Sequence, residues 1–297
     1  MNTTTLSGIP DYVPGTTLLP ETYSPEDWAT IPLGIRADGT PLLANLHASP
    51  HRIYLGGPDS AAKPAAISEI VHRAARGHQI ILADPFDTLR LSESVTSRFA
   101  RSLTHADPDA MYSMAADLRE EFSRRLRVLS DHKTRFLSDL PVHVQKRENV
   151  SPLTVVVPEI SALVSNAKRG TEQTYSVRAL VGAVAELAYD GRHLGIYVIV
   201  TGKSYTSWGI SMIARDRMDV TVTRRPYDAT VATAGLHRPF GKQVHAAVNL
   251  LNAADKHPGR AITITPTGDV VLYRVDWFER DEIDTHLEQL GVPKPRG

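Results

Sequence analysis

Short apolar runs alternate with longer amphipathic segments along most of this chain. Residues 52–57, Arg-Ile-Tyr-Leu-Gly-Gly, predict a short strand that ends in glycines. The segment 65–76 predicts a helix, because its apolar residues recur at three- and four-residue steps and Gly77 follows. The compact apolar run 79–83 then predicts a parallel strand that is buried on both faces. This part of the chain therefore predicts a strand, helix, strand unit.

A long amphipathic helix is predicted from Asp109 to about Leu137. One apolar stripe runs along it, made of Met111, Met114, Leu118, Phe122, Leu126 and Leu129. The other face carries charges of both signs, at Arg119, Glu120, Glu121, Arg124, Arg125 and Arg127. Because the signs alternate up to Arg135, the pattern favours a solvated face over a DNA-binding stripe.

The second half of the chain repeats the alternation of strands and helices. Strands are predicted at 153–157, 195–200 and 220–224, a helix at 175–189, and a closing hairpin from 261–265 and 269–274. Strands that alternate with helices indicate an α/β protein with a mostly parallel sheet covered on both faces.

The first 46 residues have a different pattern. Residues 1–30 are rich in Thr, Pro and Ser with scattered aromatic residues, which predicts an extended arm. Residues 31–46 alternate apolar positions around Asp38 and Gly39, which is a hairpin signal. We therefore expect an N-terminal arm over 1–30 and one domain over 31–297.

Composition narrows the classes of function. The 297 residues are 42% hydrophobic, enough for one sizeable core, and the formal net charge is +0, so any DNA contact has to be local. The absence of cysteine excludes disulfides and Cys-based zinc sites, and the 12 histidines form no metal-ligand spacing, so we expect no metal site. No apolar run approaches the roughly 20 residues of a membrane span, and no signal peptide is evident; a cytoplasmic protein is expected.

The turn between the first predicted strand and helix resembles a degenerate phosphate-binding loop. The pattern G-x-x-x-x-G-K-[ST] wraps backbone N–H groups around a phosphate, with Lys for its charge and Ser or Thr for magnesium. The corresponding residues here are Gly57, Pro58, Asp59, Ser60, Ala61, Ala62, Lys63 and Pro64. The first glycine and the lysine are present, whereas alanine replaces the second glycine and proline replaces the hydroxyl residue.

The order of motifs around this loop resembles the FtsK/SpoIIIE family of DNA translocases, including the EccC ATPases of type VII secretion. The similar segments are the hairpin from Ile31 to Gly39, Ser49-Pro-His, the loop at Gly56-Gly57-Pro58, Ile81-Leu-Ala-Asp84-Pro85, the arginine-rich helix from Leu118, Leu153-Thr-Val-Val-Val-Pro158-Glu159, Gly191-Arg-His-Leu-Gly195-Ile-Tyr-Val-Ile-Val-Thr201 and Pro258-Gly-Arg-Ala261. They stand in family order over residues 31–275. The resemblance implies a RecA-like P-loop NTPase fold and an oligomeric motor, such as a ring hexamer.

The resemblance also implies that magnesium chemistry is lost. In the family, the Walker B strand ends in Asp-Glu, where Asp orders water around Mg²⁺ and Glu polarises the attacking water. This chain has Pro158 and Glu159, and Pro64 has already removed the hydroxyl ligand. We therefore expect negligible ATP hydrolysis, doubtful Mg²⁺ binding and at most weak binding of ATP, with Glu159 as an inactive remnant of the catalytic position. Pro64 itself is compatible with the first turn of a helix.

Each candidate residue also has a simpler interpretation. In the simpler interpretation, Lys63 is a surface lysine and Glu159 is a carboxylate near a helix N-terminus. Asp84 is then a turn-forming residue before proline. At the position of the family's polar sensor stand Thr201 and Gly202, which match it in part. The resemblance places Arg215 and Arg217 where an arginine faces a neighbouring subunit's nucleotide, although solvated loop charges are more common.

Three functions compete at this stage. The first is a degenerate ATPase-fold protein that acts by binding, as an inactive motor subunit or as an assembly factor for a protein partner or duplex DNA, for example in a phage or mobile element. The second is an active translocase of DNA or protein that uses Asp59, Asp84 or Glu159 as unusual metal ligands. The third is a structural scaffold whose arm, 1–30, holds a neighbouring subunit.

Overall fold

The computed structural model of the protein describes residues 12–56, 62–166, 170–202, 218–223, 251, 259–264 and 270–294. Within this part of the chain, all strands belong to one ten-stranded sheet, in the order β2-β1-β10-β9-β8-β3-β7-β6-β4-β5. No helix among the described residues is both long and apolar enough to cross a membrane.

Six neighbouring strands of the sheet are parallel. They are β3 (His51–Leu55), β4 (Gln79–Ala83), β5 (Arg101–Leu103), β6 (Leu153–Val157), β7 (Ile196–Gly202) and β8 (Met218–Thr223). The remaining four pair antiparallel and extend the sheet beyond β8. These are β1 (Thr30–Arg36), β2 (Pro41–Asn45), β9 (Arg260–Ile264) and β10 (Val270–Arg274). The mostly parallel sheet and both predicted hairpins are thereby confirmed.

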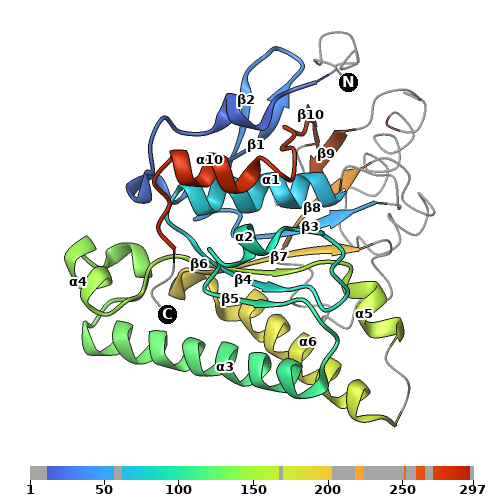
Figure 1. Ribbon diagram of the computed structural model, residues 1–297. Coiled ribbons are helices and arrows are strands. Elements are labelled where there is room, and N and C mark those ends of the chain that lie inside the picture. Colours follow the sequence, from blue (N-terminus) through green and yellow to red (C-terminus); the bar gives the residue numbers. More distant parts are fainter. Residues whose placement is uncertain are drawn as a thin grey trace.

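Helices cover both faces of the sheet, as predicted. Figure 1 shows α1 and α10 on one face, and α3 and α6 on the other. The helices are α1 (Ala62–Ala75), α2 (Glu93–Thr96), α3 (Pro108–Asp131), α4 (Val142–Arg147), α5 (Ile160–Asn166), α6 (Glu172–Asp190) and α10 (Ile283–Gln289). Short 3₁₀ turns lie at η1 (Gly15–Leu18), η2 (Pro25–Asp27), η3 (Leu137–Asp139) and η4 (Arg192–Leu194).

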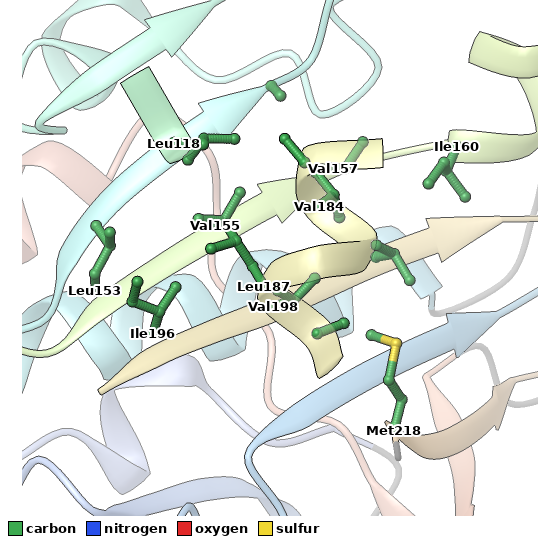
Figure 2. Close-up of a cluster of buried hydrophobic side chains, with 14 of the residues drawn as sticks. Leu118, Leu153, Val155, Val157, Ile160, Val184, Leu187, Ile196, Val198 and Met218 are labelled. Atoms are coloured by element: carbon green, nitrogen blue, oxygen red, sulfur yellow. The ribbon is translucent and has the colours of Figure 1, made fainter. Parts of the chain in front are cut away.

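The core under α3 and α6 is built on the central parallel strands. Every residue of β6 and β7 is buried, and β-branched side chains dominate both strands. Figure 2 shows how these strands meet the helices through Leu118 of α3, Val155 and Val157 of β6, Val184 and Leu187 of α6, and Val198 of β7. Strands that are covered on both faces read as continuous apolar runs, which is why the sequence identified them.

Helix α1 is buried almost all round. From Ala65 to Ala75 every residue is buried, because helix α10 and strands β1, β3, β4 and β7 of the sheet all pack against this helix. Its apolar side chains share a second core with Ile31 and Leu42 of the hairpin and Ile199 of β7.

The structure corrects the predicted long helix in two ways. The helix ends at Asp131 rather than near Leu137, because Lys133 takes a left-handed conformation with φ 51° just beyond it. Most of the predicted apolar stripe is buried, but its member Leu126 is 41% exposed, whereas Arg125, predicted on the polar face, is 1% exposed. Arg125 is buried because its guanidinium is fully engaged with the Glu121 carboxylate and with the carbonyls of Ser151 and Leu194.

The structure describes residues 12–30 of the predicted N-terminal arm, and they contact the C-terminal part of the chain. Val13 is buried, and backbone hydrogen bonds join it and Gly15 to Trp277. The Tyr23 N–H donates to the Leu290 carbonyl beyond α10.

Candidate functional site

The carboxyl ends of β3, β6 and β7 meet at one edge of the sheet, because the three strands are parallel. In register, Leu55 lies beside Gly202 and Val157 beside Val200. The Gly56 N–H donates to the Gly202 carbonyl at 3.1 Å, which ties the last residues of β3 and β7 together. This edge is where the sequence placed its candidate site.

The degenerate phosphate loop leads directly into α1. Gly57, Pro58, Asp59, Ser60 and Ala61 lie outside the described residues, as do Arg215 and Arg217. Ala62, Lys63 and Pro64 form the first turn of α1, where a proline does not interrupt the helical hydrogen bonds. Ala62 is buried, with 2% of its surface exposed, and Lys63 is half-buried. The expectation that Pro64 is tolerated here is confirmed.

Glu159 occupies the turn between β6 and α5. Its backbone is left-handed, with φ 47°, a conformation that costs a residue with a Cβ about 1–2 kcal/mol. Its carbonyl accepts the N–H groups of Ala162 and Leu163, so the residue stands at the start of the helix. The side chain is 7% exposed. Strained backbone of this kind is concentrated at functional sites, although it does not by itself assign a role.

Thr201 connects this turn to the neighbouring strand. It lies near the end of β7, is fully buried, and its hydroxyl oxygen accepts the Glu159 N–H at 2.9 Å. The residue predicted as a sensor therefore holds the backbone of the residue predicted at the catalytic position. The structure brings these two candidates together across β6 and β7.

Asp84 is engaged in a turn after β4. Its carboxylate accepts the Thr88 N–H, the Thr88 hydroxyl and the Leu89 N–H, each at 2.8 Å. Burial is the main cause that raises the pKa of Asp84, and these hydrogen bonds oppose it. The geometry fits the turn interpretation. Among the described residues no group of three or more His, Cys, Asp or Glu side chains is arranged to hold a metal.

A buried ion network anchors α1 to the strand that precedes the loop. The Glu69 carboxylate accepts a hydrogen bond from Nε of Arg73 at 3.0 Å and another from the Tyr54 hydroxyl at 2.5 Å. It also forms an ion pair with Arg52, whose Nε lies 3.3 Å away. Despite complete burial, the two arginines hold the pKa of Glu69 below its usual value. Glu69 is therefore an anion between two cations. Removing one partner from such a network costs roughly 3–5 kcal/mol, because a buried charge is left without compensation.

Sequence reasoning missed this network. The signal was nevertheless present, because Glu69 and Arg73 stand four residues apart inside the apolar part of the predicted helix, beside Ile70 and Val71. Charged residues on a buried helix face require partners from neighbouring elements. Here the partners come from β3, the strand that leads into the phosphate loop.

The described groups define what this edge of the sheet can do chemically. Lys63 lies at the positive end of the helix dipole of α1, an arrangement that attracts an anion. That Pro158 and Pro64 stand where the family has a carboxylate and a hydroxyl for magnesium remains a prediction from the sequence. Glu159 and Thr201 remain as the polar pair at the ends of β6 and β7.

Comparisons with known proteins agree with this architecture at the level of the fold. No protein-family model matches the sequence, and neither does any curated protein. Among solved structures, the conjugation coupling protein TcpA of pCW3 has a TM-score of 0.76 at 17% identity, over 96% of this chain and 75% of TcpA. EssC (ATPases 2 and 3) from Geobacillus thermodenitrificans has a TM-score of 0.69 at 14% identity.

A further likeness is to the cytoplasmic domain of the type VII secretion ATPase EccC from Thermomonospora curvata, with a TM-score of 0.66 and 17% identity. The matches cover 96% of this chain with EccC and 97% with EssC. This chain spans 34% of the EccC structure and 53% of the EssC structure. It therefore corresponds to one part of those multi-ATPase proteins. The chain has the P-loop ATPase fold that the order of its motifs predicted.

Proposed function

We propose that this chain is a catalytically degenerate FtsK/SpoIIIE-like protein that acts by binding rather than by magnesium-dependent hydrolysis of ATP. The observation that carries the proposal is the presence of proline at both positions where the family anchors magnesium, Pro64 and Pro158. Mg²⁺ supplies several kcal/mol of transition-state stabilisation in phosphoryl transfer. Without protein ligands to position the ion, hydrolysis becomes negligible.

The intact fold supports a role in assembly. The TcpA structure contains ATPγS, so a protein of this fold binds a nucleotide analogue. In this chain the start of α1, with Lys63, retains the charge that favours weak, metal-independent binding of an anion. The corresponding biological roles are an inactive subunit of an oligomeric motor, or an assembly factor for a protein partner or duplex DNA.

The alternative of an active enzyme with substitute metal ligands requires carboxylates that are available at this edge. Asp84 is occupied by Thr88 and Leu89, which disfavours it as a ligand. Among the described residues, Glu159 is the one carboxylate at the ends of β6 and β7, and the third candidate, Asp59, lies outside them. The geometry therefore supports binding over catalysis.

The test is a titration of the purified full chain with labelled ATP, with and without Mg²⁺, combined with an assay of phosphate release. We expect weak binding that Mg²⁺ does not strengthen and no release above background. Lys63→Ala should weaken any binding, because it removes the cation at the start of α1. A matched control is Lys294→Ala, since Lys294 is an exposed lysine after α10.

Turnover that requires Mg²⁺ and is abolished by Lys63→Ala but not by Lys294→Ala would contradict the proposal. Restoring the family's residues with Pro64→Thr and Pro158→Asp together provides a positive control. If the lost anchors are the reason for inactivity, the double variant gains magnesium-dependent binding of ATP.

A further inference from the structure

A recess of about 230 Å³ lies at the opposite, amino edge of the parallel strands, away from the candidate nucleotide site. Four separate segments build it: the chain before β1, the β2–β3 connection, η3, and η4 with the start of β7. Its lining residues are Trp28, Leu46, His47, Phe136, Leu137, Ser138, Arg192, His193 and Tyr197.

Aromatic rings form much of the wall of this recess. The Trp28 ring centroid lies 5.0 Å from that of His47 and 6.0 Å from that of Tyr197. The backbone of Trp28 is fixed by a hydrogen bond, which its carbonyl accepts from the buried His78 imidazole at 2.9 Å. Phe136 is 38% exposed. The recess is thus preformed, and its exposed ring is that of Phe136, over which the Arg135 guanidinium lies at 5.5 Å from the ring centroid.

The polar groups of the recess can both donate and accept hydrogen bonds. Burial lowers the pKa of His193, so its imidazole is neutral at pH 7 and offers one donor and one acceptor. The Ser138 hydroxyl, which is exposed, has the same dual capacity. Arg192 adds a cation, and its guanidinium also donates to the His47 carbonyl.

Next to the recess lies an exposed basic segment, residues 132–147, which contains η3 and α4. Asp139 lies within it and Asp131 and Glu148 flank it, with Arg147 paired to Glu148 at 3.0 Å; its four exposed cations are Lys133, Arg135, Lys146 and Arg147. In Figure 1, α4 projects from the body of the protein beside the C-terminal end of α3. Over residues 131–148, four cations stand against three acids, which leaves a small excess of positive charge in a chain of formal net charge +0.

We propose that the recess and the basic segment together form a binding site for single-stranded nucleic acid. One base enters the recess and packs against Phe136, and the flanking phosphates lie along residues 132–147. Aromatic faces combined with a basic track are the two features that bind single strands without sequence preference. A duplex does not fit this site, because its bases are paired and stacked inside the helix.

The hydrogen-bonding groups of the recess favour a nucleobase over a carboxylate side chain. A carboxylate only accepts hydrogen bonds, whereas a base edge both donates and accepts, as His193 and Ser138 do. The site also lies at the other edge of the sheet from Lys63 and Glu159. Binding here is therefore independent of whether the chain hydrolyses ATP.

The test measures fluorescence anisotropy of a labelled oligothymidylate with the full chain, in the absence of nucleotide and magnesium. We expect binding that weakens as salt concentration rises. Phe136→Ala should weaken it by about 5- to 150-fold, the range that corresponds to stacking of one base on an aromatic ring. Lys133→Glu combined with Arg135→Glu should weaken it further and reduce the salt dependence. The matched control is Arg178→Glu, an exposed arginine on α6, which should bind as the unmodified chain does.

An abasic oligonucleotide of the same length and a polyglutamate peptide separate the sources of affinity. The proposal requires weaker binding of both. Equal binding of the abasic strand would show that the recess takes no base, and stronger binding of polyglutamate would identify an acidic protein partner instead. Either result overturns the proposal, as does the absence of any anisotropy change at low salt. Because no ATP is present, these results leave the proposed loss of hydrolysis untouched.

Discussion

Glu159 keeps a backbone conformation that its own side chain disfavours, because the chain turns sharply from β6 into α5 at this position. The strand motif located the residue, since Leu153 to Glu159 matches a Walker B pattern. Its left-handed φ could not be predicted, because the conformation is imposed by tertiary structure. What stabilises it is the hydroxyl of Thr201, a residue 42 positions away in the sequence.

This hydrogen bond gives a prediction for Thr201→Val. Valine keeps the shape of threonine but removes the acceptor, which leaves the buried Glu159 N–H without its partner. We expect the free energy of unfolding to fall by about 1–3 kcal/mol, as measured by urea denaturation. Hydrogen exchange at the Glu159 amide should accelerate as well.

Thr201→Ser is the matched control, because serine retains the hydroxyl and loses only a methyl group. The Glu159 amide should stay protected in this variant even if packing costs some stability. Equal acceleration of exchange in both variants would mean that the hydroxyl does not hold the turn.

At the scale of elements, the connection from α6 to β7 contains a sequence motif whose structural reason lies in tertiary packing. The segment Gly191-Arg-His-Leu-Gly195 resembles a motif of the FtsK/SpoIIIE family. A Cβ added at Gly191 would lie 2.4 Å from the Leu187 carbonyl oxygen, and Gly195 has φ 68°. Both glycines are therefore required by the tight η4 turn. The packing of Leu137 against Gly195 joins parts of the chain that are distant in sequence, so no local pattern reveals it.

A second inter-element feature is the polar chain that runs from α1 to the residues before β1. Arg73 donates to the Thr154 hydroxyl at 3.1 Å, and the Thr154 hydroxyl lies 2.9 Å from Nδ1 of His78. Because Nε2 of His78 faces the Trp28 carbonyl, it carries the proton and Nδ1 accepts from Thr154. Burial, reinforced by the charge of Arg73, lowers the pKa of His78 to about 3.

The depressed pKa predicts an acid-sensitive contribution to stability. An unfolded histidine has a pKa of about 6.5, so the unfolded chain takes up a proton below that pH while folded His78 stays neutral. Its contribution is fully present above about pH 6.5 and is lost as the pH falls toward 3. Between about pH 7.5 and pH 5 the loss should be of the order of 2 kcal/mol.

His78→Gln removes the titrating group and should reduce the difference in unfolding free energy between these two pH values. The matched control is His143→Gln, because His143 is exposed on α4 and should leave the difference unchanged. Similar pH dependence in His78→Gln and in the unmodified chain would show that His78 is not the responsible group.

At the scale of the whole molecule, sequence patterns identified five of the six parallel strands and both hairpins, but neither the short strand β5 nor how the strands join. Period and composition define an element, whereas the pairing of β8 with β9, and of β10 with β1, depends on contacts between distant segments. The result is one continuous sheet. The β1–β2 hairpin is therefore part of the main structure, and its apolar side chains share a core with α1 and β7.

Because of this shared core, a destabilising substitution in the β1–β2 hairpin should also destabilise the central strand β7. Leu42 of β2 is 5% exposed and belongs to the cluster with Ile70 of α1 and Ile199 of β7, whereas its neighbour Leu43 is 53% exposed. Leu42→Ala should lower the free energy of unfolding by about 2–5 kcal/mol, and Leu43→Ala by about 0.5 kcal/mol or less. Hydrogen exchange tests the coupling directly: in Leu42→Ala, amides of β7 should lose as much protection as amides of β1. Loss of protection confined to β1 and β2 would show that the hairpin opens as an independent unit, despite the core that it shares with α1.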